Sequence, residues 1–428
     1  MTDTNSNAPC LRCDGWDHIR GLAAVAVVLL HGAYAYSYEP LSGLLWVVPL
    51  DEPHMAADLV FWAVEGFVMP LFFVMSGFFL AQSFMGRPAR QVFRGRSRRL
   101  LIPLMAVGVP ILIIDLWVWG LGLVSMGMLT MKQYVRADYP YDIRMDLFGP
   151  AHLWYLQYLW VMCGLTTLGV LAHGRWRAKR AERLGSVEVA HPLARVVGRV
   201  DRWTLGGLGV LGSLVVLILA IEPAVVVGFQ HNWLPAPAKF LHGFCFLLVG
   251  MLLYRSQGMI KALGGAAPWL FAAAAAVLWY LWPQFHATLR TGDGTAFDFS
   301  LGFWTAMYAF LACGAAIGAG QRWLARPNRV LSELAAASFW VYVAHHPILG
   351  LVQLGMRETS LSAGAKFVVG TTLVMVICLA TYRVMVKDRL IGRLMDGNLP
   401  AWRGERPVVV PIPEAMPGLG VDETRRAA

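Results

Sequence analysis

Long apolar stretches, each close to the length that crosses a membrane, alternate with short polar segments along this chain. A transmembrane helix needs about 20 mostly apolar residues to cross about 30 Å of hydrocarbon. The stretches cover residues 19–36, 59–80, 100–123, 152–172, 205–221, 240–254, 268–282, 301–318, 334–354 and 367–386. The pattern predicts an all-α fold, a polytopic membrane helix bundle with about ten transmembrane helices.

The composition supports a membrane protein. Of the 428 residues, 57% are hydrophobic and 14% are charged, and the mean hydropathy is +0.55. Soluble globular domains are less apolar and more highly charged. The net charge of +10 is of the sign that nucleic acid attracts, but the basic residues flank apolar stretches, where topology and anionic lipid headgroups account for them. We therefore expect membrane lipids as partners and no nucleic acid.

Basic residues set the expected orientation. Most of them lie on the side of the two termini, while the first loop on the other side has acidic charges alone. The positive-inside rule then predicts cytoplasmic termini. No cleavable signal sequence is recognised before the first stretch. Residues 1–18 are expected to form a cytoplasmic tail, 19–386 the membrane domain and the proline-containing segment 387–428 a largely disordered cytoplasmic tail.

The six cysteines do not predict a disulfide framework. Four of them fall within apolar stretches, where cysteine behaves as a small apolar side chain. Cys10 and Cys13 form a C-x-x-C pair, which lacks the two further ligands of a structural zinc site. We favour an ordinary tail over a metal or redox role, and expect no bound metal.

Ionisable residues inside apolar stretches are the main functional candidates, because the membrane interior tolerates few of them. His31 follows Arg20 by eleven residues, which places it about 16 Å deeper, near mid-membrane. His345 follows Glu333 by twelve residues and reaches about 18 Å. Glu65 approaches from the other side to within a turn or two of that depth. The three groups are expected to share one layer.

His31 is the candidate general base, since a neutral imidazole accepts a proton near neutral pH. The alternative is a histidine that only hydrogen-bonds a neighbouring helix. His345 is a second catalytic candidate, or part of a structural polar stripe with Ser338 and Tyr342. Glu65 is expected to orient a histidine or to pair with an arginine.

Arginines and aromatic residues mark the two ends of the bundle. Arg20, Arg96 and Arg99 lie at the cytoplasmic boundary, where guanidinium groups bind phosphates, contact lipid headgroups or set topology. His152, Trp154 and Tyr155 lie at the outer end of the fourth stretch. Their rings suit stacking on sugars, and an interfacial aromatic belt is the alternative.

Four segments carry a resemblance to a known family. They are Asp17-x-x-Arg20 followed by His31, Phe72-Phe73-x-x-Ser76-Gly77-Phe78, Arg96-x-x-Arg99 followed by Pro103, and Ser338-x-x-x-Tyr342-x-x-His345-His346-Pro347. In this order they resemble the motifs of the membrane acyltransferase 3 family, over nearly the whole chain. Met69-Pro70 and the Ala151–Leu156 stretch are most similar to its glucan biosynthesis protein C branch, which is associated with succinylating periplasmic glucans. Val68 departs from that branch, which tends to have arginine there.

The resemblance implies an acyltransferase of the class that transfers groups other than aminoacyl groups, in a bacterial inner membrane. The donor is then a cytoplasmic acyl-CoA, which acts as a co-substrate, and no bound cofactor is expected. The acceptor is a hydroxyl of an extracytoplasmic carbohydrate. Transfer is direct, with or without an acyl-histidine intermediate, or passes through a separate periplasmic partner. The implied substrate-binding residues are Arg20, Arg96, Arg99, Asp17, Ser76, His152, Trp154, Tyr155, Ser338, Tyr342 and His346.

A polytopic transporter is the competing class. In that case the intramembrane arginine, histidine and glutamate residues form a proton or substrate pathway, and no covalent bond changes. Transfer of acyl label from acyl-CoA to extracellular carbohydrate distinguishes the two classes.

Overall fold

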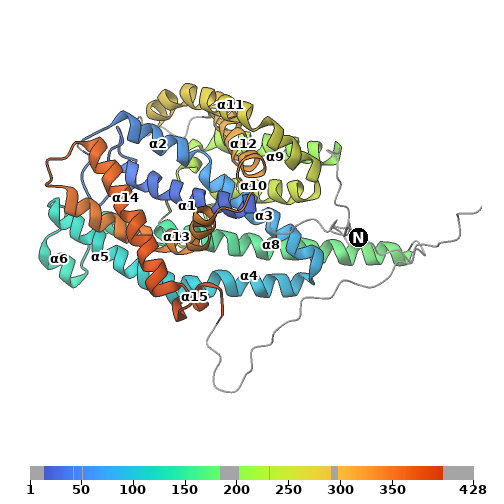
Figure 1. The fold of residues 1–428 in the computed structure, drawn as a ribbon, viewed down its shortest axis with the longest axis horizontal. Helices are drawn as coiled ribbons and strands as arrows, with labels where there is room; N and C mark the ends of the chain where they lie inside the picture. The colour runs from blue at the N-terminus through green and yellow to red at the C-terminus, as the bar shows by residue number, and fades with distance from the viewer. Residues whose placement is uncertain are drawn as a thin grey trace, which may run out of the picture.

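Helices form nearly all of the regular structure in the computed structural model, which describes residues 14–41, 43–50, 52–183, 202–230, 232–290 and 297–398 (Figure 1). The α-helices are α1 Asp14–Tyr34, α2 Met55–Glu65, α3 Val68–Gly86, α4 Ala89–Pro103, α5 Val109–Ser125, α6 Met131–Arg136, α7 Tyr141–Leu147, α8 Trp154–Arg183, α9 Arg202–Ile221, α10 Pro237–Arg255, α11 Gln257–Arg290, α12 Phe299–Arg322, α13 Arg329–Met356, α14 Ala363–Thr381 and α15 Leu390–Met395. Short π or 3₁₀ segments are η1 Leu104–Gly108, η2 Ala151–Leu153, η3 Pro223–Val226 and η4 Tyr382–Val386. The Cys10 and Cys13 pair lies outside the described residues.

Nine helical segments of the described chain have the length and composition to cross a membrane. They are Met55–Gly86, Ala89–Ser125, Ala151–Arg183, Arg202–Ile221, Pro237–Arg255, Gln257–Ala287, Phe299–Arg322, Arg329–Met356 and Ala363–Val386. Each contains one of the stretches expected from the sequence, and the polytopic helix bundle is thereby confirmed. The remaining expected span, 19–36, corresponds to α1.

Helix α1 is not among the nine segments with the length and composition to cross a membrane, and it lies in the middle of the bundle. Its 21 residues include Asp14, Asp17, Arg20 and His31, which lower its hydropathy, although the helix is about 32 Å long. It packs against α2, α12, α13 and α14, and most of its residues are buried. Neighbouring helices therefore shield its polar side chains from lipid, which allows a helix with these residues to be central.

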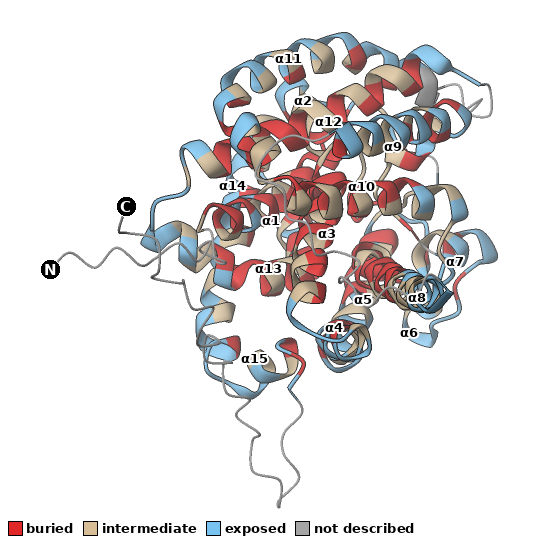
Figure 2. Cartoon of the chain, turned by 90° about the vertical axis from the view of Figure 1, so that its right-hand side faces the viewer, coloured by how far each residue is buried: buried red, intermediate tan, exposed pale blue. Residues whose placement is uncertain are grey.

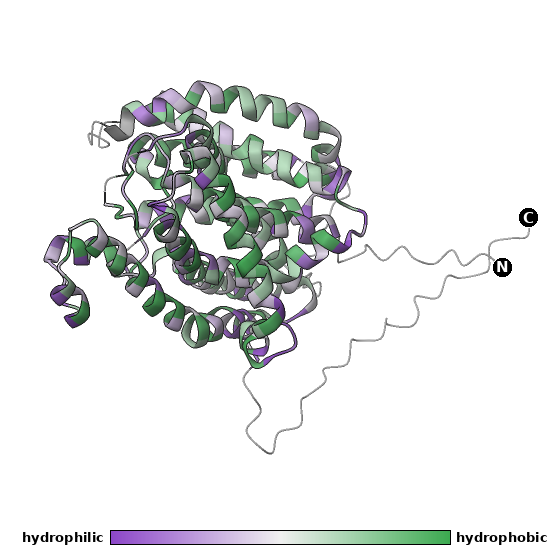
Figure 3. Cartoon of the chain, turned by 60° about the vertical axis from the view of Figure 1, so that its left-hand side comes forward, coloured by the Kyte–Doolittle hydropathy of each residue, from purple (hydrophilic) through white to green (hydrophobic). Residues whose placement is uncertain are grey.

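The peripheral helices show the opposite arrangement. In α11 only 11% of the most apolar window is buried inside the protein, against 67% in α13. Figure 2 shows the buried residues gathered on α1, α3, α10 and α13, with exposed residues along α11. Apolar residues also cover the outside of the bundle, and polar ones collect at its ends (Figure 3). This distribution is typical of a helix bundle surrounded by lipid.

Small residues let the central helices approach closely. A Cβ atom on Gly21 of α1 would lie 2.8 Å from the backbone nitrogen of Ala335 in α13. Gly77 of α3 and Gly250 of α10 each face the backbone of the other helix in the same way. Close approach through glycine is a common means of packing membrane helices. At Gly21 it brings the arginine and histidine of α1 next to α13.

The first part of the C-terminal tail differs from the expectation of disorder. Residues 387–398 are described and include α15, which packs against α4. Gly397, with φ of 76°, lies against the backbone of Arg98 and Arg99. A side chain at that position would collide with α4. Residues 399–428 lie outside the described chain.

Candidate active site

A cavity of about 580 Å³ runs through the bundle beside α1, α3 and α13. Arg20, Arg96 and Arg99 line it at one end, and His31, Glu65 and His152 line it deeper in the bundle. Apolar side chains fill much of the wall between them. They include Ala24, Val27, Leu30, Met69, Phe72, Met75, Phe79 and Phe339. The cavity therefore connects a cationic end to a group of buried polar residues.

Specific contacts hold the guanidinium groups at the cationic end. Arg20 donates from Nη2 to the carbonyl of Ala335 at 3.1 Å and forms an ion pair with Asp17 at 3.1 Å. Arg96 donates to Ser83 Oγ at 3.4 Å. These bonds use only part of the donor capacity of each arginine, since a guanidinium has five N–H groups. The remaining donors suit a polyanion such as a phosphate group.

His31 and His345 are directly hydrogen-bonded, with 2.9 Å between Nδ1 of His31 and Nε2 of His345. Nδ1 of His345 lies 2.9 Å from the carbonyl of Val341 and 3.0 Å from that of Tyr342. A carbonyl only accepts, so this nitrogen carries the proton and Nε2 of neutral His345 is an acceptor. Nδ1 of His31 must then be the donor. The lone pair of His31 is consequently on Nε2, as a general base requires.

His345 lies behind His31, away from the cavity. Its side chain is fully buried and is not part of the cavity wall, whereas His31 is. The hydrogen bond and the stacked rings, whose centroids are 4.9 Å apart, fix the orientation of His31. The geometry gives His31 access to a substrate and gives His345 a positioning role.

Pro347 explains how His152 is attached to α13. A proline in a helix has no N–H to donate to the carbonyl four residues earlier, here that of Val343. Nε2 of His152 donates to this carbonyl at 3.0 Å. Tyr342 Oη also donates to the backbone carbonyl of His152 at 2.7 Å. The break in the helix therefore anchors the start of α8 beside the two histidines of α13.

His346, which the sequence analysis singled out, pairs with a carboxylate that it did not single out, that of Asp115. Nδ1 of His346 lies 2.7 Å from Oδ1 of Asp115, a buried carboxylate of α5. The ring of His346 stacks on Trp119, with centroids 4.1 Å apart, and on His152, with centroids 4.7 Å apart. Asp115 could have been found from the sequence, because it is the one acidic residue in the stretch 100–123, and ionisable residues in membrane spans are functional candidates.

Asp115, His152 and His346 each offer a metal-ligand atom, and these atoms lie within 4.8 Å of one another. The imidazole planes of His152 and His346 are only 19° from parallel in the stack. A metal ion binds in the plane of each imidazole, and two stacked rings do not direct their lone pairs to one point. The arrangement fits a hydrogen-bonded and stacked cluster better than a preformed metal centre.

Glu65 is buried in the cavity wall and contacts the segment before α10. Its carboxylate accepts a hydrogen bond from the backbone N–H of Gly228. Among the described residues no hydrogen bond or ion pair joins it to a histidine or an arginine, so neither role expected from the sequence matches its contacts. Phe229, the next residue, packs its ring edge against His31 with centroids 5.4 Å apart. Glu65 therefore helps to hold the segment that contacts the candidate base.

Hydroxyl groups bond to one another across the middle of the cavity. Tyr155 donates to the carbonyl of Phe72 at 3.2 Å, and Ser76 is 2.7 Å from Tyr155 Oη. Ser338 donates to the carbonyl of Ala335 at 2.8 Å. Tyr155, Ser76 and Ser338 line the cavity, yet each already has a partner within the protein.

Most site residues expected from the sequence meet at this one cavity. Those that line it are Arg20, His31, Glu65, Ser76, Arg96, Arg99, His152, Trp154, Tyr155, Ser338 and Tyr342. Asp17, His345 and His346 do not line it, and they contact Arg20, His31 and His152, respectively. Their contacts favour supporting roles over direct binding of a substrate.

The fold, the cavity and its histidines agree with a match to a family model. The model describes an acyltransferase domain, and it matches residues 14–383. The chain belongs to the acyltransferase 3 family, and is therefore a multi-pass membrane acyltransferase.

Full-length relatives are distant. The chain is 22% identical over 421 residues to glucans biosynthesis protein C of Salmonella typhimurium (strain LT2), with 94% of this chain and 100% of the relative covered. It is 24% identical over 412 residues to glucans biosynthesis protein C of Escherichia coli O6:K15:H31, with 89% of this chain and 94% of the relative covered. No solved structure matches the chain.

Proposed function

We propose that this protein transfers a short acyl group, acetyl or succinyl, from cytoplasmic acyl-CoA to a hydroxyl of an extracytoplasmic carbohydrate such as a periplasmic glucan. The membrane is the bacterial inner membrane, and both termini are cytoplasmic. The acyltransferase family supports the reaction type, and the names of the distant relatives support a glucan as acceptor. The arginine-lined end of the cavity then faces the cytoplasm.

The single observation that carries the proposal is the continuous cavity between the arginines and His31. The CoA phosphates bind at Arg20, Arg96 and Arg99, and the pantetheine arm follows the apolar wall inward. Arg20 precedes His31 by eleven residues, or about 16 Å of helix. An extended pantetheine arm is long enough to carry the thioester across this distance.

His31 acts as the general base in this proposal. The acceptor hydroxyl gives its proton to Nε2 of His31 as its oxygen forms a bond to the thioester carbonyl carbon. The C–S bond then breaks, and CoA leaves as a thiolate that receives the proton from His31. The products are an O-acylated carbohydrate and CoA. His345 holds His31 in the tautomer that accepts the proton, through the bond at 2.9 Å.

Mass spectrometry of periplasmic and cell-surface glycans tests the proposal. Cells should carry the wild type, His31→Ala, His173→Ala or no copy of the gene. His173 is an exposed histidine of α8, so its variant controls for loss of a histidine elsewhere. An O-acyl mass increment is expected with the wild type and His173→Ala alone. Equal acylation in all strains, with each variant shown to be in the membrane, would contradict the proposal.

A further inference from the structure

Among the described residues, the deep end of the cavity wall has the carboxylate of Glu65 and no lysine or arginine. Glu65 is 2% exposed and lines the cavity near His31. One of its oxygens accepts the Gly228 N–H. Whether ionised or protonated, this group gives no positive charge to a ligand. The arginines that line the cavity are at its other end.

Lys239 is the cation close to this region, and its ammonium group is already engaged. Its Nζ donates to the carbonyls of Val227 and Phe229, both at 2.7 Å. It also lies over the ring of Trp154, 5.4 Å from the centroid. Lys239 is not part of the cavity wall, but it lines a small adjoining pocket together with Glu65, Met69 and Trp154. A ligand in the cavity would have to displace the bonds of Lys239 to Val227 and Phe229 to form an ion pair with it.

Most of the rest of the wall near Glu65 is apolar or hydrogen-bonded. Nδ1 of His152 has no partner among the described residues, and it is an acceptor because Nε2 of that ring donates to the carbonyl of Val343. Met69, Phe72 and Trp154 present apolar surfaces to the cavity, and Tyr155 already bonds to Phe72 and Ser76. Val68, next to Met69, is fully buried. A second carboxylate brought here would be desolvated without a partner. It would also be repelled by ionised Glu65 through a medium of low dielectric constant.

We propose, building on the acyl transfer described above, that the donor carries a short uncharged acyl chain and that Glu65 excludes dicarboxylic acyl groups such as succinyl. The thioester carbonyl lies at His31, so the distal end of the acyl chain extends into the region that Glu65 and the apolar side chains form. An acetyl, propionyl or butyryl chain carries no charge and is compatible with a region formed by a carboxylate and apolar side chains. Glu65 is thus a specificity-determining residue.

The test compares acyl-CoA donors on the purified full-length protein in proteoliposomes, with a periplasmic glucan as acceptor. Butyryl-CoA and succinyl-CoA have acyl chains with the same number of carbons and differ in the terminal carboxylate, so their comparison separates charge from length. Acetyl-CoA serves as the short neutral donor. The readouts are kcat/KM from CoA release and the acyl mass increment on the glucan.

The wild type is expected to use butyryl-CoA at least about tenfold better than succinyl-CoA, because a like charge in a desolvated site raises the barrier for the dicarboxylic donor. Glu65→Gln keeps an acceptor for the Gly228 N–H and removes the charge. In this variant, the ratio of kcat/KM for butyryl-CoA to kcat/KM for succinyl-CoA is expected to fall by about tenfold. Glu52→Gln, which removes a carboxylate at the end of the bundle away from the cavity, should leave the ratio unchanged.

Different results overturn different statements. Succinyl-CoA used as well as butyryl-CoA by the wild type would overturn the proposed donor class and leave acyl transfer intact, and this comparison needs no variant. An unchanged ratio in folded Glu65→Gln would overturn the assignment of Glu65. Absence of transfer from every donor by protein that binds CoA normally would contradict the proposed function itself.

Discussion

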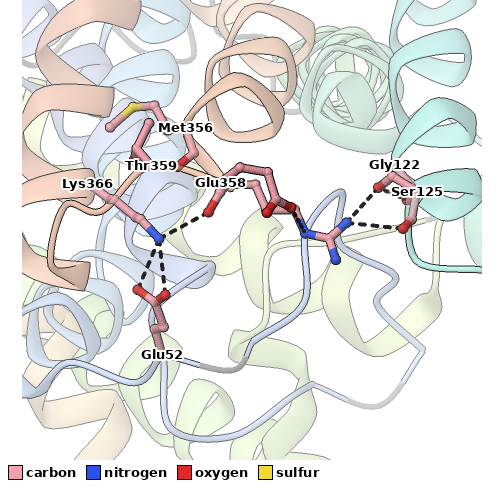
Figure 4. A network of polar contacts seen from close by, with 8 residues as sticks. Glu52, Gly122, Ser125, Met356, Glu358, Thr359 and Lys366 are labelled. Atoms are coloured by element: carbon pink, nitrogen blue, oxygen red, sulfur yellow. Dashed lines mark hydrogen bonds and ion pairs between the residues drawn. The ribbon is translucent and has the colours of Figure 1, made fainter.

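Two polar networks, at different depths of the bundle, use charged side chains in different ways. The deep network consists of two buried hydrogen-bonded pairs, His31 with His345 and His346 with Asp115, and the rings of His31 and His346 are in contact. The other lies at the end of α13, where Lys366 contacts Glu52 at 3.0 and 3.3 Å (Figure 4). The deep network borders a cavity that reaches the arginines, whereas the network at the helix end joins loops.

The hydrogen-bond partners in the two networks also differ. In the network of Figure 4, Lys366 donates to the carbonyl of Arg357, and Arg357 donates to Ser125. These bonds hold together the segment before α2, the end of α5, the residue after α13 and the first turn of α14.

In the deep network Nδ1 of His31 is committed to His345, whose two nitrogens are both engaged, and Nδ1 of His346 is committed to Asp115. The hydrogen bond to His345 leaves a defined lone pair on Nε2 of His31. The deep network therefore has a group available for the proposed chemistry, whereas the contacts at the helix end join segments of the fold.

Replacing His31 should have the largest effect. His31→Gln removes the base and is expected to lower kcat by about 10²–10⁴-fold, the usual contribution of a general base. The substituted residue lines a cavity, so the variant should still fold. Transfer of acyl label from acyl-CoA to glucan by purified protein measures the effect. Retention of more than a tenth of the wild-type kcat would remove His31 from the proposed mechanism.

Replacing Asp115 is expected to act mainly on the stability of the protein. Asp115→Ala leaves the buried Nδ1–H of His346 without its acceptor, at a cost of about 1–3 kcal/mol. Asp115→Asn keeps an acceptor oxygen and should cost less. Denaturant unfolding in detergent micelles measures both, with exposed Asp138→Ala as the control. Equal destabilisation by Asn and Ala would show that this hydrogen bond is unimportant.

Pro347 allows a test of how His152 is held. Pro347→Ala supplies a backbone N–H that competes with His152 for the carbonyl of Val343, now bonded at 3.0 Å. The helix should be no less stable, since alanine favours a helix, while kcat falls by about tenfold because α8 loses its anchor beside the histidines. Steady-state kinetics together with thermal unfolding separate these effects. Full activity in the folded variant would show that the anchor is dispensable.

The sequence predicts the membrane helices and the similar depth of His31 and His345, because depth along a helix follows from residue number. Their hydrogen bond depends in addition on the packing of α1 against α13. It does not predict how Glu65 is used, since its partner Gly228 lies in an irregular segment whose path depends on tertiary contacts. The link from Pro347 through Val343 to His152 also depends on two distant helices being adjacent. Composition predicts a largely disordered tail over residues 387–428, but residues 387–398 include α15, which packs on α4.

Breaking the network at the helix end should have the smallest effect. Lys366→Met removes the ion pair with Glu52, whose side chain is 46% exposed and can be rehydrated. The loss of stability should be about 1 kcal/mol or less, as for other pairs with a solvated partner, and kcat should stay within about twofold of the wild type because no residue of the cavity is touched. Thermal unfolding and acyl transfer by the same preparation measure both quantities, with Lys132→Met on exposed α6 as the control. A loss of activity comparable to that of His31→Gln would mean that the two networks are coupled through α13, and that the contrast between them does not hold.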